Sequence, residues 1–122
     1  MAKKILIADD EAEIRKAIRL SISGRGYEIY EAKDGYETLE LAAQILPDLV
    51  ILDVMMPGMI GYRVCQELRK DPKTKDTIVV FLTARTTNLS DEAAFEAGGD
   101  EYIPKPFLPG ILRERIKQLL GE

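Results

Sequence analysis

Residues 49–53 are Leu49-Val50-Ile51-Leu52-Asp53, four apolar side chains in succession followed by an acid. A strand of this composition has no polar face, so we expect both of its faces to be covered, as in a parallel sheet flanked by helices. Residues 5–8 (ILIA) and 78–82 (IVVFL) have the same character. These three runs predict the buried centre of a parallel sheet.

Two further runs are typical of edge strands, because residues 27–30 alternate between apolar and polar side chains and residues 102–103 form only a short run. Segments with helical spacing separate the five runs, at residues 11–23, 36–46, 62–70, 91–97 and 111–120. Connections of this length join parallel strands through right-handed crossovers. We therefore predict an α/β fold with a single (βα)5 doubly wound parallel sheet of five strands.

The composition indicates one globular domain and excludes several kinds of catalytic and metal site. The 122 residues, 46% of them hydrophobic, suit one soluble globular domain over residues 1–122. The absence of His excludes a Ser-His-Asp triad, a His-ligated zinc and a phosphohistidine of the chain's own. The one cysteine, Cys65, shares a predicted helix face with Val64 and Leu68, so we expect it in the core. A chain without an internal disulfide suits a reducing compartment, and we expect a cytoplasmic protein.

Charge and hydropathy argue against two kinds of partner. The 17 Lys and Arg residues against 21 Asp and Glu residues give a net charge of −4, so we expect no direct nucleic acid binding. The apolar run after Lys3-Lys4 ends within four residues at Asp9, which is too short for a signal peptide. No other run approaches the length of a membrane span, and we expect no membrane association.

Polar side chains stand at the carboxyl ends of four predicted strands: Asp9 and Asp10 after the first, Asp53 after the third, Thr83 after the fourth and Lys105 just past the fifth. Doubly wound sheets bind ligands at this edge. Each residue alone has an ordinary explanation as a helix cap, a turn residue or a surface charge. Their joint occurrence at one edge favours a functional site.

Three carboxylates at one edge of a sheet repel one another, so either their pKa values rise or a cation lies among them. A cluster of oxygen ligands without His or Cys suits a hard ion, and Mg²⁺ is the first choice because it completes its shell with water and phosphate oxygens. Lys105 and Thr83 would offer a phosphoryl group a positive charge and a hydroxyl. The residues point to phosphoryl chemistry with Mg²⁺.

Four stretches carry a resemblance to a known family: ILIADDE (5–11), LVILDVMMPGMIG (49–61), VVFLTA (79–84) and AGGDEYIPKPF (97–107). They resemble the receiver domain of two-component response regulators, and the resemblance extends from Lys3 to Leu120. It implies the flavodoxin-like strand order 2-1-3-4-5. In that order the second strand, which ends in Glu31-Ala32, lies at an edge, away from a site centred on the third strand.

The resemblance also implies a function and a set of roles. The chain would be the phosphoacceptor of a two-component phosphorelay, a signalling switch that catalyses its own phosphorylation and dephosphorylation and is not otherwise an enzyme. Asp53 would take the phosphoryl group from a phosphohistidine, with Thr83 and Lys105 holding the phosphoryl oxygens. The Mg²⁺ ligands would be Asp10, Asp53 and the backbone carbonyl of Met55, with Asp9 acting partly through water. Thr83 and Tyr102 would form the switch that reshapes the face made by the fourth helix, the fifth strand and the fifth helix.

Some finer expectations follow from the same resemblance. The Lys105-Pro106 bond would be cis, aiming the lysine inward. Met55 and Arg85 occupy the positions that tune the lifetime of the aspartyl phosphate, and a bulky apolar Met55 predicts slow loss of the phosphoryl group. Ile60 stands where the family commonly has Asp, which puts a side-chain cap of the third helix in doubt.

Two other functions use the same residues or fold. A Mg²⁺-dependent phosphohydrolase with an Asp nucleophile would use these carboxylates and Lys105, but such enzymes typically carry a D-x-D motif on the first strand. A flavodoxin-like flavin carrier needs a Gly-rich phosphate loop where Asp9, Asp10 and Glu11 would repel phosphate. A third alternative is a pseudo-receiver, a folded interaction module that is not phosphorylated.

The expected partners are a histidine kinase or phosphotransfer domain and an unknown downstream protein or output domain. Kinase docking near the first helix is one interpretation of Ile14 and Ile18, and burial in the core is the other. The chain is expected to be a monomer or a phosphorylation-dependent dimer. Asp100, Glu101 and Arg115 partly match the dimer surface of transcription-factor receivers. The sequence leaves open a stand-alone messenger or a part of a longer regulator.

Overall fold

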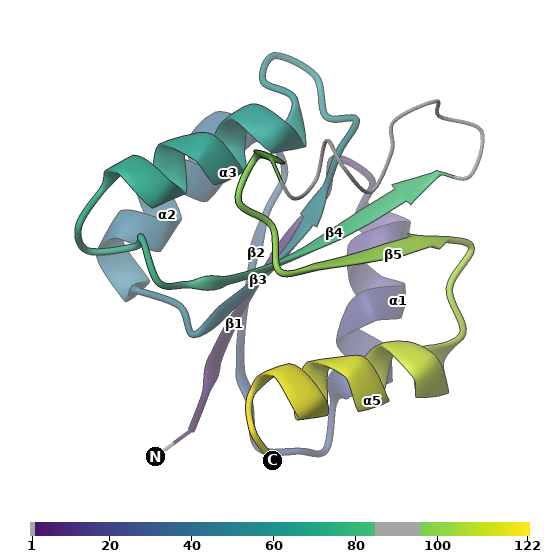
Figure 1. Cartoon of the computed structure of the whole chain (residues 1–122). Coiled ribbons are helices and arrows are strands. Elements are labelled where there is room, and N and C mark those ends of the chain that lie inside the picture. The colour runs from purple at the N-terminus through teal and green to yellow at the C-terminus, as the bar shows by residue number, and fades with distance from the viewer. Residues whose placement is uncertain (1, 85–95) are drawn as a thin grey trace.

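We describe the protein from a computed structural model, which describes residues 2–84 and 96–122. The strands are β1 (Lys4–Ala8), β2 (Glu28–Ala32), β3 (Leu49–Asp53), β4 (Ile78–Ala84) and β5 (Glu101–Lys105). The helices are α1 (Ala12–Ile22), α2 (Gly35–Ile45), α3 (Gly61–Lys70) and α5 (Pro109–Leu119). From β1 to β4 strands and helices alternate along the chain, as Figure 1 shows.

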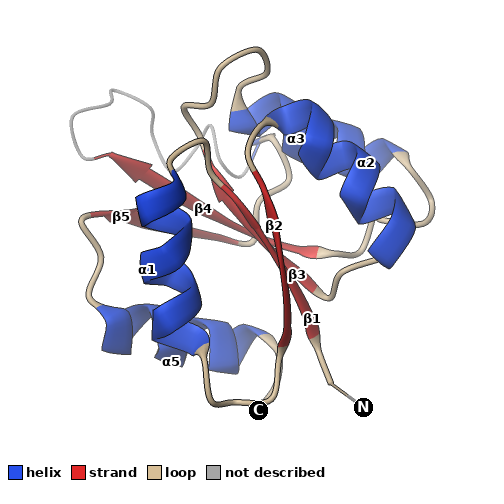
Figure 2. Ribbon diagram, turned by 180° about the vertical axis from the view of Figure 1, so that it is seen from behind, coloured by secondary structure: helices blue, strands red, loops and turns tan. Residues whose placement is uncertain are grey.

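The sheet has five parallel strands in the order β2-β1-β3-β4-β5, which confirms the predicted fold class. Helices α1 and α5 cover one face, and α2 and α3 cover the other (Figure 2). The central register pairs Ile5 with Leu49 and Ala8 with Leu52, so β1 and β3 end at the same edge. This register sets their terminal acids side by side.

The two faces of the sheet make two separate cores. Leu6 and Val50 belong to the cluster under α2 and α3, whereas Ile7 and Ile51 belong to the cluster under α1 and α5. Successive residues of a strand point to opposite faces, so an unbroken apolar run supplies both clusters. Every residue of β3 is buried, as the composition of residues 49–53 predicts.

The fifth strand is longer than predicted. It extends from Glu101 to Lys105, so Lys105 is its last residue and does not lie beyond it. Pro104 lies inside the strand opposite Thr83. Among the described strands β5 pairs with β4 alone, so one side of its backbone is at the sheet edge, where a residue without an N–H is tolerated.

Several local expectations can be compared with the structure. Asp34 caps α2, since its Oδ1 accepts a hydrogen bond from the Glu37 backbone N–H at 2.8 Å. Ile60 gives α3 no side-chain cap, as its apolar side chain requires. Cys65 is buried in the core, and burial raises the pKa of its thiol to about 11. The Lys105–Pro106 bond is cis.

Some predictions fall wholly or partly outside the described residues. Most of the helix expected at residues 91–97 does so, as does Arg85, so neither is tested. None of the helices within residues 2–84 and 96–122 is long and apolar enough to cross a membrane.

Gly61, the last residue of the 49–61 stretch, lies against the end of β3. A Cβ atom at this position would stand 2.3 Å from the backbone oxygen of Asp53 and 2.9 Å from the Cα of Val54. The Gly61 N–H also donates to the Val54 oxygen at 2.7 Å. A side chain here would therefore push on the main chain that positions Asp53.

We predict that Gly61→Ala destabilises the protein by about 2–3 kcal/mol, the upper range for inserting a methyl group into a packed site. Urea unfolding followed by circular dichroism measures the change. The matched control is Gly110→Ala in α5, where a Cβ meets nothing within 4 Å. An Ala in an open helical position should be neutral or stabilise the fold by up to about 1 kcal/mol. Equal stability of the two variants would contradict the close approach.

Candidate functional site

Three acids meet at the carboxyl edge of the sheet. Asp9 follows β1, Asp10 stands next to it, and Asp53 is the last residue of β3. Each offers a carboxylate oxygen within 4.8 Å of the others. Asp9 and Asp53 are buried, whereas Asp10 is exposed. The cluster therefore has a closed inner side and an open outer side that faces solvent.

Lys105 joins two of these acids. Its Nζ donates to Asp9 Oδ2 at 3.0 Å and to Asp53 Oδ1 at 3.3 Å. Only 18% of the lysine side chain is exposed. The amine of β5 thus points into the cluster, because the sheet order brings the end of β5 to the same edge as β1 and β3.

The electrostatics of Asp53 reflect this crowding. Burial and the neighbouring Asp9 charge raise the pKa of Asp53 from 3.8 to about 6, against the opposing effect of Lys105 and a backbone hydrogen bond from Met55. Burial alone would lower the pKa of Lys105, but its hydrogen bond to Asp9 and the charges of both acids outweigh burial and raise it. At neutral pH Asp53 is a carboxylate and Lys105 an ammonium.

Thr83 lies on β4 beside the cluster and is fully buried. Its Oγ1 has no hydrogen-bond partner among the residues that the structure describes. A buried hydroxyl without a partner is uncommon in folded proteins and costs free energy. Tyr102 is partly buried against the core beneath α2 and α3, and pairs in the β4–β5 register with Phe81.

The acid cluster fits a divalent cation of the hard type. Its side-chain donors are all oxygens, and one ammonium group faces three carboxylates. Buried carboxylates in excess of positive charge favour Mg²⁺ or a similar ion. Met55 stands two residues after Asp53, is 57% exposed, and its backbone hydrogen-bonds to Asp53.

Sequence reasoning missed a support of this site. The Arg15 guanidinium donates to Glu31 and also to the backbone oxygen of Asp9. From the sequence, Glu31 is expected to lie away from the site because β2 is an edge strand, and β2 contributes no carboxylate to the cluster. No local pattern pairs Arg15 with Glu31, which lie 16 residues apart and meet only in the folded chain.

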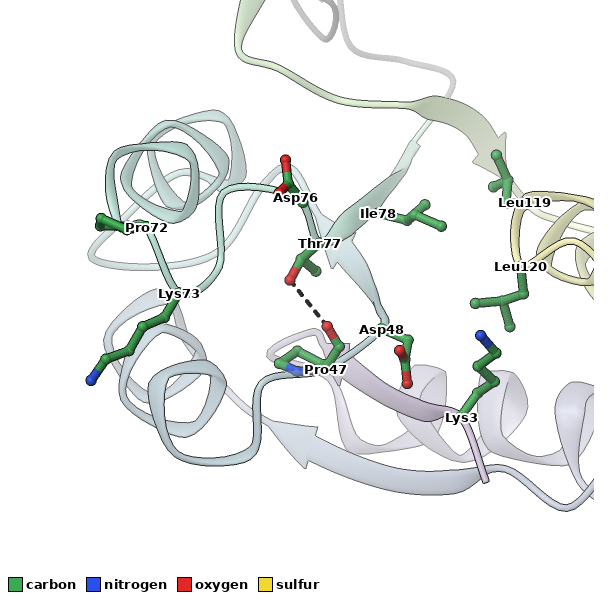
Figure 3. A pocket seen from close by; sticks show the side chains of 10 residues that line it. All are labelled: Lys3, Pro47, Asp48, Pro72, Lys73, Asp76, Thr77, Ile78, Leu119 and Leu120. Carbon is green, nitrogen blue, oxygen red and sulfur yellow. Dashed lines mark hydrogen bonds between the residues drawn. The ribbon is translucent and has the colours of Figure 1, made fainter. Parts of the chain in front are cut away.

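A pocket of about 350 Å³ lies at the opposite edge of the sheet. Figure 3 shows it between the start of β4 and the end of α5, with Ile78 facing Leu119 and Leu120, and with Thr77 donating to the Pro47 oxygen at 3.0 Å. Lys3 and Asp48 line it from the starts of β1 and β3. It contains none of the predicted site residues.

The residues considered for partner contacts lie in different environments. Ile18 is buried in the core, and Ile14 is partly buried against the same cluster, so the core interpretation holds for Ile18.

Asp100 accepts from Arg69 at 3.0 Å, and Glu101 accepts from Arg115 at 2.7 Å. The charges considered for a dimer surface are therefore paired within the chain.

Comparison with known proteins agrees with the fold. A sequence model of the response regulator receiver domain matches residues 5–117. The chain is 42% identical over 120 residues to the response regulator MprA of Mycobacterium sp. strain KMS, covering 98% of this chain and 51% of that protein. It is 46% identical over 118 residues to ycf27 of Guillardia theta, named a probable transcriptional regulator, covering 97% and 45%.

Among solved structures, the chemotaxis response regulator CheY4 of Vibrio cholerae superposes with a TM-score of 0.90 at 29% identity, covering 98% of this chain and 99% of that one. The chain spans about half the length of the curated relatives it matches. The match of the family model to nearly the whole chain, on a sheet of the expected order, places this chain in the family of response regulator receiver domains, the signalling switches of two-component systems.

Proposed function

We propose that Asp53 is the phosphoacceptor of this receiver domain and that the surrounding side chains catalyse both its phosphorylation and its dephosphorylation. The observation that carries the proposal is the ammonium of Lys105 in contact with both Asp9 and Asp53. The three acids of the cluster are then two positive charges short of balance, and the exposed Asp10 faces solvent. A phosphoryl donor and a divalent cation can both reach that side.

A carboxylate oxygen of Asp53 attacks the phosphorus of a phosphohistidine on a histidine kinase or phosphotransfer domain. A P–O bond forms, the P–N bond breaks, and its electron pair stays on the imidazole nitrogen. Asp53 needs no general base, because it is already ionised at neutral pH. Lys105 lies within reach of the phosphoryl oxygens, and the unpaired hydroxyl of Thr83 gives them a hydrogen-bond donor.

Mg²⁺ would be held by Asp10, Asp53 and the backbone carbonyl of Met55, with Asp9 acting partly through water. When bound, it neutralises charge on the transferred phosphoryl group. Asp9 orients Lys105, since it is the closer of the two acids to the amine. The same residues can hold a water for hydrolysis, which makes the signal transient.

Thr83 and Tyr102 form the proposed switch. A hydroxyl drawn toward the phosphoryl group leaves space behind it, and the partly buried Tyr102 ring can move inward on the neighbouring strand. The exposed surface of β5 and α5 then changes shape for a downstream protein or output domain. The chain acts as a monomer or as a phosphorylation-dependent dimer.

The test is intact-mass spectrometry after incubation with acetyl phosphate and Mg²⁺. The wild-type protein should gain the mass of one phosphoryl group, and Asp53→Asn should gain none. Asp48→Asn is the matched control, because Asp48 stands just before the same strand at the opposite edge of the sheet. It should be phosphorylated as the wild type is.

Two outcomes would overturn the proposal. A folded wild-type protein that gains no mass would be a pseudo-receiver, an interaction module without phosphoryl chemistry. An equal gain in Asp53→Asn would place the phosphoryl group on another residue.

A further inference from the structure

Arg15 joins the edge strand to the acid pair. It lies on α1, in the first turns of the helix that follows Asp9 and Asp10. Its Nε donates to Glu31 Oε1 at 2.9 Å, and its Nη1 donates to the backbone oxygen of Asp9 at 2.7 Å. The Arg15 side chain is 18% exposed and that of Glu31 32%, so this bridge is partly protected from solvent.

The Arg15 contact completes the set of bonds that fixes Asp9. The Asp9 N–H donates to the Ala32 oxygen at 3.1 Å, which ties it to the end of β2. Its Oδ1 accepts from the Glu11 N–H at 2.9 Å, and its Oδ2 accepts from Lys105 at 3.0 Å. The remaining group is the carbonyl that Arg15 holds, and this carbonyl belongs to the peptide plane between Asp9 and Asp10.

The orientation of that peptide plane sets the position of the Asp10 main chain. Asp10 is the exposed member of the acid cluster. An exposed side chain is placed mainly by the main chain that carries it. A guanidinium anchored at one end by Glu31 and bonded to the Asp9 carbonyl at the other can therefore set the spacing of the two acids.

Glu31 holds the arginine in place. Its second oxygen, Oε2, accepts from Arg19 Nε at 2.9 Å. Burial tends to raise the pKa of Glu31, but the hydrogen bonds from Arg19 and Arg15 outweigh that effect and lower it. Arg19 thus shares the acceptor of Arg15, but its other hydrogen bond goes to the Ile29 oxygen.

We propose that Arg15 is a positioning residue for divalent-cation binding: with Glu31 as its anchor, it holds the Asp9–Asp10 peptide so that both carboxylates face a common ion. The proposal rests on the proposed function, since it assumes that the cluster binds a cation. Arg15 does not contact the ion. Residues that orient metal ligands in this way typically contribute about 10- to 100-fold to metal affinity.

The sign of the effect separates positioning from simple charge. A guanidinium near a cation site repels the ion, so its charge alone would weaken binding, and removing that charge would tighten it. Positioning predicts the reverse, namely that losing the bridge weakens binding. Arg15→Lys isolates the positioning effect. Lysine keeps the positive charge but lacks the planar guanidinium that bonds both Glu31 and the Asp9 oxygen.

The experiment measures the affinity of the whole chain for Mn²⁺, which takes the same oxygen ligands as Mg²⁺, by counting free Mn²⁺ with electron paramagnetic resonance at neutral pH. Arg15→Lys should bind at least about tenfold more weakly than the wild type. Arg19→Lys is the matched control, with the same change on the same helix and the same Glu31 partner but without the Asp9 bond, and it should bind within about twofold. Urea unfolding checks that both variants are folded.

A second variant tests the anchor. Glu31→Ala frees Arg15 and should weaken Mn²⁺ binding, and adding it to Arg15→Lys should weaken binding little further, because both changes break one bridge. Wild-type affinity in Arg15→Lys, or an equal loss in Arg19→Lys, would overturn the positioning role and leave the proposed function standing. A wild-type protein that binds neither Mn²⁺ nor Mg²⁺ would overturn both.

Discussion

Lys105→Met should destabilise the metal-free protein at neutral pH by about 3–5 kcal/mol, the usual cost of removing one partner from a buried ion pair. The lysine is the group that lies between Asp9 and Asp53, whose side chains are only 1% and 7% exposed. Without it, two buried carboxylates face each other with no compensating charge. Urea unfolding in the absence of divalent cations measures the loss.

The stability lost in Lys105→Met should depend on pH. As the pH falls through the pKa of Asp53, a proton takes over the neutralising role of the lysine, so the difference from the wild type should shrink near about pH 4. Phosphoryl uptake from acetyl phosphate should also fall, by about 10²- to 10³-fold, because one charged donor to the transferred group is lost.

The matched control is Lys4→Met on β1 at the other edge of the sheet. Lys4 Nζ donates to the Ile45 oxygen at 3.2 Å and pairs with no described carboxylate. Its loss should cost at most about 1.5 kcal/mol, as for one ordinary hydrogen bond, and the cost should not shrink in acid. A Lys105→Met variant as stable as Lys4→Met would mean that the amine does not compensate the acids.

Much of this fold could be predicted because its central strands are apolar throughout. A run such as residues 49–52 can bury both of its apolar faces only between two helical layers. The structure divides the side chains of these runs between two cores. The gathering of Asp9, Asp10 and Asp53 follows from the same argument, since parallel strands end at one edge. Their chemical roles remain predictions.

The boundaries and supports could not be predicted in the same way. The short apolar run predicts a fifth strand at residues 102–103, but the strand extends to Lys105, and its edge position among the described strands accommodates Pro104. The bridge from Arg15 to Glu31 and Asp9 depends on how α1 packs beside β2, which no spacing in the sequence specifies. The close approach of Gly61 to Asp53 likewise appears only in three dimensions.

Asp53→Asn should remove phosphoryl uptake and should also make the metal-free protein more stable at neutral pH. Burial and the Asp9 charge raise the pKa of Asp53 from 3.8 to about 6 in the folded state. The folded protein therefore holds this proton more tightly than the unfolded chain does. The favourable contribution is fully present below pH 3.8 and is lost as the pH rises through about 6.

Above that range the ionised carboxylate opposes folding by up to about 3 kcal/mol, since one pKa unit corresponds to about 1.4 kcal/mol. This penalty already includes the attraction of Asp53 to Lys105. A neutral amide escapes it, so we expect a gain of about 1–3 kcal/mol for Asp53→Asn near about pH 7.5 and little difference near about pH 4. Urea unfolding across this pH range, without divalent cations, measures it.

Asp34→Asn is the control. Asn caps a helix about as well as Asp, and the capping hydrogen bond to Glu37 is exposed, so the stability of this variant should follow the wild type. Added Mg²⁺ should stabilise the wild type and Asp34→Asn but stabilise Asp53→Asn far less, since a ligand stabilises only the state that binds it. Under the proposed function, the charge that opposes folding of the metal-free protein is the same charge that would bind the ion and attack phosphorus. A less stable Asp53→Asn at neutral pH would show that the pairing with Lys105 outweighs the crowding of the acids.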